Sequence, residues 1–71
     1  MIKKYKYRIY IEWSEQDDCF LVALPDFPGQ KYRAHGYSYL DAVLNAQDVI
    51  SALVHSYNRS EQLPIPKLAE Y

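Results

Sequence analysis

The chain has 71 residues, a formal net charge of −1 and a single cysteine. This length accommodates one domain, the small net charge gives no global field that favours nucleic acid, and one cysteine excludes a disulfide within the chain. No stretch is long and apolar enough for a membrane span, and "MIKKYKYR" lacks the apolar region of a signal peptide, so we expect a single cytoplasmic domain over residues 1–71.

Residues 5–13 carry apolar or aromatic side chains at every odd position and mostly polar ones at even positions. This alternation predicts a first strand whose odd row faces the core. The polar, acidic stretch 14–18 predicts a turn. Residues 19–24 are apolar throughout, which predicts a second strand that is covered on both faces and forms an antiparallel hairpin with the first.

The second strand offers two apolar rows, and one helix covers only one of them. The row that faces the core is one of two sets: Phe20, Val22 and Leu24, or Cys19, Leu21 and Ala23. A domain of this size buries only ~60% of its unfolded surface, and self-association commonly supplies the missing stability. The uncovered row and the small size together predict a dimer or tetramer.

The segment "ALPDFPGQ" (23–30) follows the second strand. Its two prolines end that strand and Gly29 allows the chain to reverse, while Phe27 either caps the core or presents its ring to a partner. Residues 30–35 alternate again and predict a short, charged edge strand. We expect Gly36 to end this strand with a positive φ.

Residues 39–58 predict a helix that begins at the N-cap Ser38, with Asp41 in its first turn. Its apolar positions fall on one stripe at helical spacing, namely Leu40, Val43, Leu44, Ile50, Leu53, Val54 and Tyr57. Two prolines keep the tail, residues 60–71, extended. The expected class is α+β: a three-stranded antiparallel sheet with one helix packed on one face, in the order β-β-β-α.

Several residue types that perform chemistry are present, but none stands in a reactive pattern. Acid–base work or metal binding could use Asp17, Asp18 and Asp26, although aspartate in such loops more often serves turns. His35, His55 and Cys19 have no partner spaced to form a catalytic triad or a zinc site. We therefore expect a protein that is not an enzyme, with no catalytic residue, cofactor or metal site.

Basic residues alternate with tyrosines at the start of the chain. Lys4, Lys6 and Arg8 could grip RNA while neighbouring rings stack on bases. Alternation places the rings and the charges on opposite faces, which favours an ordinary solvated strand face. RNA contact by these three residues remains an alternative.

The string "IEWSEQDDCFLVALPDFPG…HGYSYLDAVLNAQDVISALV" resembles the HicB-like antitoxin family over nearly the whole chain. One matching segment runs from Pro25 to Gly29, a Pro-Asp-hydrophobic-Pro-Gly pattern. The positions that match at the helix start are Gly36, Ser38, Leu40, Asp41, Ala42, Asn45 and Ala46. At Gln30 the chain departs from the family, which often has cysteine there.

The resemblance implies a truncated RNase H-like fold and a protein that neutralises a small HicA-type mRNA-cleaving toxin by covering its active site. The candidate partner-binding residues are Tyr10, Glu15, Asp17, Asp18, Asp26 and Phe27. The chain matches only the N-terminal domain of full antitoxins, without their C-terminal DNA-binding domain, so we expect no direct DNA binding. The alternative is a small RNA-binding or oligomeric interaction protein that has no toxin partner.

Overall fold

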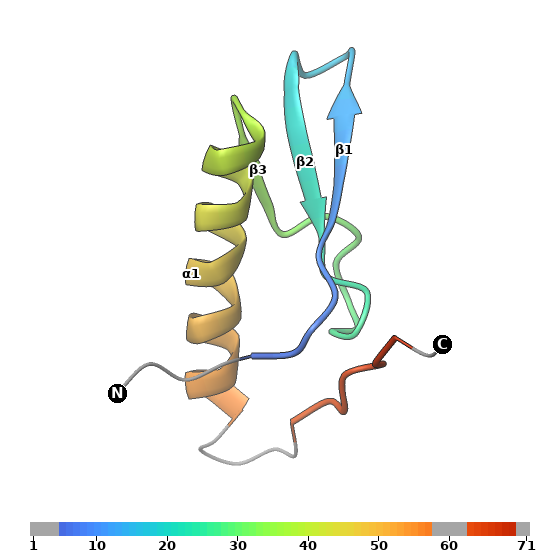
Figure 1. The fold of residues 1–71 in the computed structure, drawn as a ribbon, viewed down its shortest axis with the longest axis vertical. Helices are drawn as coiled ribbons and strands as arrows, with labels where there is room; N and C mark the ends of the chain where they lie inside the picture. Colours follow the sequence, from blue (N-terminus) through green and yellow to red (C-terminus); the bar gives the residue numbers. More distant parts are fainter. Residues whose placement is uncertain (1–4, 58–62, 70–71) are drawn as a thin grey trace.

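The computed structural model describes residues 5–57 and 63–69. Three strands, β1 (Tyr10–Ser14), β2 (Cys19–Ala23) and β3 (Ala34–Gly36), precede one helix, α1 (Tyr39–Tyr57). The strands form an antiparallel sheet in the order β1-β2-β3, and α1 lies along one face of it (Figure 1). The expected α+β arrangement, β-β-β-α, is therefore present.

The β1–β2 hairpin forms as its alternation and turn chemistry predict. Its register places Ile11 opposite Val22 and Trp13 opposite Phe20. The Asp18 N–H donates to the Ser14 carbonyl at 2.8 Å, and Asp18 adopts a left-handed φ of 55°. Aspartate tolerates this conformation better than most residues, which suits it to the end of the turn.

The first and third strands are shorter than the sequence predicts. β1 begins at Tyr10 rather than at residue 5, because the Arg8 N–H is taken by the Asp26 carboxylate and not by a neighbouring strand. β3 covers only 34–36 rather than 30–35. Just before β3, the Arg33 N–H donates to the Val22 carbonyl. Val22 is also the register partner of Ala34, so Arg33 and Ala34 together lie opposite Val22, as in a β-bulge.

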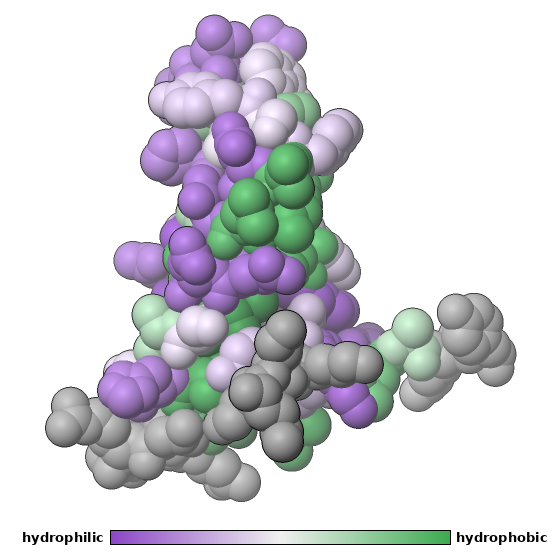
Figure 2. All heavy atoms as spheres, turned by 60° about the vertical axis from the view of Figure 1, so that its left-hand side comes forward, coloured by the Kyte–Doolittle hydropathy of each residue, from purple (hydrophilic) through white to green (hydrophobic). Residues whose placement is uncertain are grey.

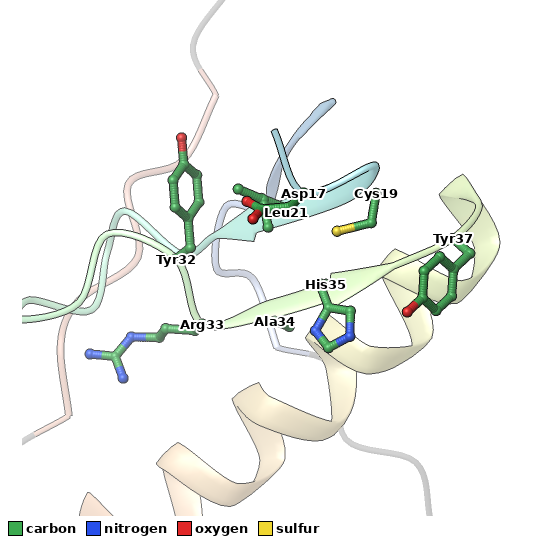
Figure 3. Close-up of a pocket in the computed structure, with 8 residues that line it drawn as sticks. All are labelled: Asp17, Cys19, Leu21, Tyr32, Arg33, Ala34, His35 and Tyr37. Atoms are coloured by element: carbon green, nitrogen blue, oxygen red, sulfur yellow. The ribbon is translucent and has the colours of Figure 1, made fainter. Parts of the chain in front are cut away.

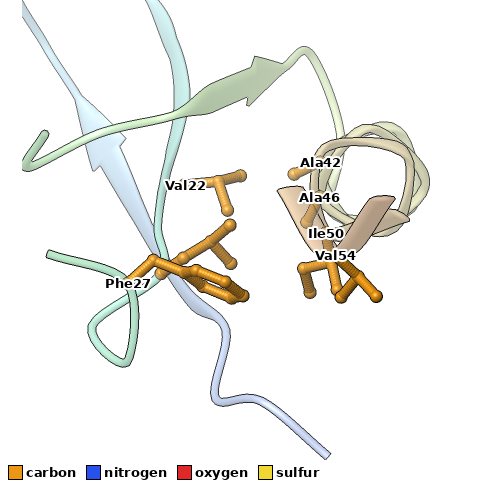
Figure 4. Packing of buried hydrophobic residues seen from close by; sticks show 7 residues of the cluster. Val22, Phe27, Ala42, Ala46, Ile50 and Val54 are labelled. Carbon is orange, nitrogen blue, oxygen red and sulfur yellow. The ribbon is translucent and has the colours of Figure 1, made fainter. Parts of the chain in front are cut away.

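The core lies between α1 and the helix-facing row of β2 (Figure 4). Val22 and Leu24 are fully buried there, so the row that contains Phe20, Val22 and Leu24 is the one that faces the helix. Phe27 is 2% exposed and closes one end of the same cluster. Of the two roles expected for Phe27, its ring therefore caps the core and does not present itself to a partner.

The helix runs over 39–57, close to its predicted bounds, and the predicted end at Asn58 lies outside the described residues. Its N-terminus is capped as expected, since the Ser38 hydroxyl accepts a bond from the Asp41 N–H at 3.0 Å. The predicted apolar stripe was wrong in its first turns, because Leu40 and Leu44 are 67% and 50% exposed. The side chains of α1 that are fully buried are Ala42, Ala46, Ile50 and Val54.

Small residues decide which side of α1 meets the sheet. A Cβ on Gly36 would lie 2.5 Å from the backbone nitrogen of Ala42, so only glycine allows this approach. The expectation of a positive φ at Gly36 was wrong; among the described glycines only Gly29 has one, at 113°. Gly36 is thus required for close packing and Gly29 for chain reversal.

The outer row of β2 is largely covered by the chain itself. Cys19 is buried and both Leu21 and Ala23 are half-buried. The Tyr32 side chain lies across this face, and its hydroxyl donates to the Glu12 carboxylate at 3.1 Å. The predicted surplus apolar row is therefore small, and the large exposed apolar side chains lie elsewhere.

Candidate partner-binding surface

The hairpin turn presents three carboxylates to solvent. Glu15, Asp17 and Asp18 are all exposed, and they occupy four consecutive positions of the chain together with Gln16. The Ser14 hydroxyl donates to Asp17 at 2.9 Å and accepts from the Asp17 N–H at 3.1 Å, which holds the turn in one shape. Glu15 accepts a bond from the Trp13 indole at 3.0 Å. The result is a compact acidic tip at the end of the hairpin.

Asp26 occupies a different environment, since its side chain is only 4% exposed. Its carboxylate accepts bonds from the Arg8 guanidinium at 2.9 and 3.2 Å and from the Arg8 N–H at 3.0 Å. A fourth bond comes from the Lys67 N–H in the tail, at 3.4 Å. The segment 23–30 (the Pro/Gly segment), the start of the chain and its tail are therefore joined at one carboxylate.

Burial alone would raise the pKa of Asp26, because it disfavours the charged form. The bonds from Arg8 and Lys67 outweigh that effect and hold the pKa below its ordinary value. Asp26 thus remains ionised and committed to internal contacts. It serves the architecture of the domain and offers almost no surface to a partner.

The remaining predicted site residues, as far as the structure describes them, lie in β1 and in the segment just before it. Tyr10 is exposed at the start of β1, at the opposite end of this strand from the acidic tip, and its hydroxyl accepts a bond from Arg8 at 3.3 Å. Arg8 therefore contacts Asp26 and Tyr10 at once, whereas Lys6 is exposed. Lys4 lies outside the described residues. The structure brings Arg8 and Asp26 together, although the sequence analysis made Arg8 a candidate for RNA contact and Asp26 a candidate for partner binding.

An open depression lies on the outer face of the sheet, beside β2 and β3 (Figure 3). Cys19 and Leu21 belong to its lining, with Tyr32, His35 and Tyr37 around them and Asp17 near the turn. The sequence did not predict it, because only the pairing of β2 with β3 brings residues of the hairpin and residues 32–37 to one face. Figure 3 shows the Arg33 guanidinium directed away from these residues.

The depression brings a cysteine, a histidine and an aspartate to one face, so their geometry decides whether they form a reactive group. Among residues 5–57 and 63–69, no hydrogen bond joins any two of Asp17, Cys19 and His35. The same residues hold no group of three or more His, Cys, Asp or Glu side chains that could bind a metal ion. Aromatic rings and the carboxylate of Asp17 are among the groups that line the depression.

Within the described part of the chain, no helix has the length and apolar character needed to cross a bilayer. In comparisons with known proteins, no family model matches the chain, and neither the curated proteins nor the solved structures contain a significant match.

Proposed function

We propose that this protein is a binding module of the HicB-like antitoxin type, which neutralises a small HicA-type mRNA-cleaving toxin by covering its active site. The β-β-β-α order is compatible with the truncated RNase H-like fold that the resemblance implies. The observation that carries the proposal is the acidic tip formed by Glu15, Asp17 and Asp18. The proposed action is contact without catalysis.

Electrostatic attraction supports this contact. A toxin that binds mRNA needs a basic surface for the phosphate backbone. Three exposed carboxylates on a rigid turn provide the complementary charge, which accelerates encounter and orients docking. The proposed contact extends from this tip along the outer face of β1 toward Tyr10, and excludes Asp26 and Phe27 because both are buried.

The alternative of direct RNA binding has less support from the geometry. Of its three basic residues, Arg8 is engaged by Asp26 and is therefore not free to neutralise a phosphate. RNA affinity depends on the neutralisation of several phosphates, so the loss of this cation weakens the case for RNA binding.

The test is binding to a purified HicA-type toxin whose catalytic histidine has been replaced, so that the complex can be made without RNA cleavage. We expect a stable complex on size-exclusion chromatography, and loss of RNA cleavage when the protein is added to active toxin. Replacement of all three tip carboxylates (Glu15→Gln, Asp17→Asn and Asp18→Asn) should lower the association rate at low salt by about tenfold or more.

The control is the double variant Asp41→Asn/Asp48→Asn, which removes two exposed carboxylates from α1, to be compared with both the triple tip variant and the double variant Asp17→Asn/Asp18→Asn. It should leave the association rate within about twofold of the parent protein, because these groups lie outside the proposed contact. Absence of a complex with HicA-type toxins would refute the proposal. Equal effects of the two sets of substitutions would refute the role of the acidic tip.

A further inference from the structure

The outer edge of β1 carries backbone groups that have no partner in the described part of the chain. The Val22 carbonyl accepts from Arg33, so the backbone of Val22 points toward β3 and not toward its β1 neighbour, Ile11. By the alternation of an antiparallel ladder, the N–H and C=O groups of Ile11 and Trp13 point away from β2. Among the described residues none donates to or accepts from these four groups.

An apolar patch lies next to this edge, on the side of the sheet that carries α1. Trp13 is 47% exposed and its ring meets Phe20 edge-on, with centroids 5.0 Å apart. Phe20 in turn packs against Tyr39 at the start of α1, at 4.5 Å. Leu40 and Leu44 in the first turns of the helix are also exposed, and we take them together with the aromatic row as one apolar patch.

The orientation of α1 places Leu40 and Leu44 on the side of the helix that faces away from β3. Asn45 donates to the His35 carbonyl at 2.6 Å, so its flank of the helix faces β3. At about 100° per residue, Leu40 lies roughly 140° around the helix from Asn45 and thus away from β3. Figure 2, with α1 turned toward the reader, shows hydrophobic side chains gathered in one area near mid-height, below a hydrophilic upper end.

We propose that a second copy of this chain pairs with the β1 edge, antiparallel and about a two-fold axis perpendicular to the sheet. The main-chain groups of Ile11 and Trp13 then bond to the same strand of the other copy, which joins two three-stranded sheets into one of six strands. Such an axis keeps both helices on the same face. The two patches meet in the strip between the helices, directly above the paired β1 strands.

Symmetry favours a second copy as the occupant. The five side chains of the patch are themselves uncharged, and among the described residues the one carboxylate bonded to a member of the patch is that of Glu15, which accepts from the Trp13 indole. An antiparallel strand pair is itself two-fold symmetric, so an open edge with both donors and acceptors complements its own copy. The proposal does not rest on the toxin contact, which uses the acidic tip and the opposite face of the sheet.

The test compares two matched variants by light scattering after size-exclusion chromatography, at tens of micromolar. Leu40→Glu and Ile65→Glu each replace an exposed aliphatic side chain with a carboxylate, but Ile65 lies in the tail and outside the patch. We expect the parent protein and Ile65→Glu to have twice the mass of one chain. Leu40→Glu should raise the dissociation constant at least tenfold, with an unchanged circular dichroism spectrum.

Hydrogen exchange distinguishes this interface from any other. The Ile11 and Trp13 amides should exchange more slowly at high concentration than in dilute protein, and by a larger factor than the Asn45 amide within α1, which pairing protects only through the added stability of the fold. A tetramer that Leu40→Glu reduces to dimers would support the pairing. A monomer at tens of micromolar, equal behaviour of the two variants, or concentration-independent exchange at Ile11 and Trp13 would overturn it.

Discussion

The carboxylate of Asp26 accepts bonds from Arg8, 18 residues before it, and from Lys67, 41 residues after it. A charge that is almost completely enclosed is stable only when such partners satisfy it. Removal of the charge without a change in shape should therefore leave the Arg8 guanidinium without its partner and loosen both segments that meet there.

We expect Asp26→Asn to lower the melting temperature by about 5 °C or more at pH 7, since about 1 kcal/mol corresponds to 4–8 °C for a domain of this size. The folded-state pKa lies below the unfolded value, so the stabilisation is fully present above about pH 4 and is lost as the pH falls through the folded pKa. The difference between parent and variant should accordingly stay constant from pH 7 to about 5 and shrink below about 4. Thermal unfolding followed by circular dichroism measures it.

Asp48→Asn is the matched control for this experiment, because Asp48 is exposed on α1 and has no hydrogen bond to any described residue. Its melting temperature should differ little from that of the parent protein at every pH. A difference between parent and Asp26→Asn that grows with acidity would contradict the assigned direction of the pKa.

At the scale of the elements, the contact between α1 and β3 depends on a missing side chain. Gly36 lets the first turn of the helix come so close that a Cβ would lie 2.5 Å from the backbone of Ala42. Ala42 and Ala46 are both fully buried along this line. The leucines that would suit a helix at ordinary distance from a sheet are consequently turned outward.

Gly36→Ala should destabilise the fold by about 1–3 kcal/mol, the usual cost of forcing extra atoms into a packed contact. Here the obstacle is backbone rather than a flexible side chain, so α1 must move as a unit. Chemical denaturation with urea measures the change. A free energy of unfolding within about 0.5 kcal/mol of the parent value would show that the helix does not approach the strand this closely.

At the scale of the whole molecule, the described tail is held against the start of the chain. Tyr7 packs on Phe27 with ring centroids 4.5 Å apart, and its hydroxyl donates to the Pro64 carbonyl at 2.7 Å. Leu63 packs against the core cluster. These contacts, together with the bond from Lys67 to Asp26, tie the two ends of the domain to its Pro/Gly segment.

Tyr7→Phe should release the tail while it leaves the core intact, because the ring that packs on Phe27 is kept. Loss of one hydrogen bond is worth about 1 kcal/mol, so the Lys67 amide should exchange about fivefold faster. Tyr37→Phe is the control, since Tyr37 is exposed and its hydroxyl bonds to no described residue. If the two variants gave the same exchange at Lys67, the Tyr7 bond would not hold the tail.

Much of the fold follows from local patterns in the sequence. Alternation predicted β1, a continuous apolar run predicted β2, the acidic stretch predicted their turn, and Ser38 with a helical period predicted the start of α1. These signals are local because the strand and helix periods and the turn chemistry involve only neighbouring residues. The same patterns failed where packing decides, at the ends of β1 and β3 and at Leu40 and Leu44.

The candidate partner-binding surface, like the fold, could be predicted from the sequence only in part. The acidic tip could be identified from the sequence, since a turn exposes its carboxylates wherever the hairpin lies. The pairing of Arg8 with Asp26, the depression beside Tyr32 and Tyr37, and the patch around Trp13 join residues that are distant in the chain. Sequence alone therefore determined the elements and their order, whereas the tertiary structure decided which charges are enclosed and which apolar side chains stay exposed, because long-range packing sets both.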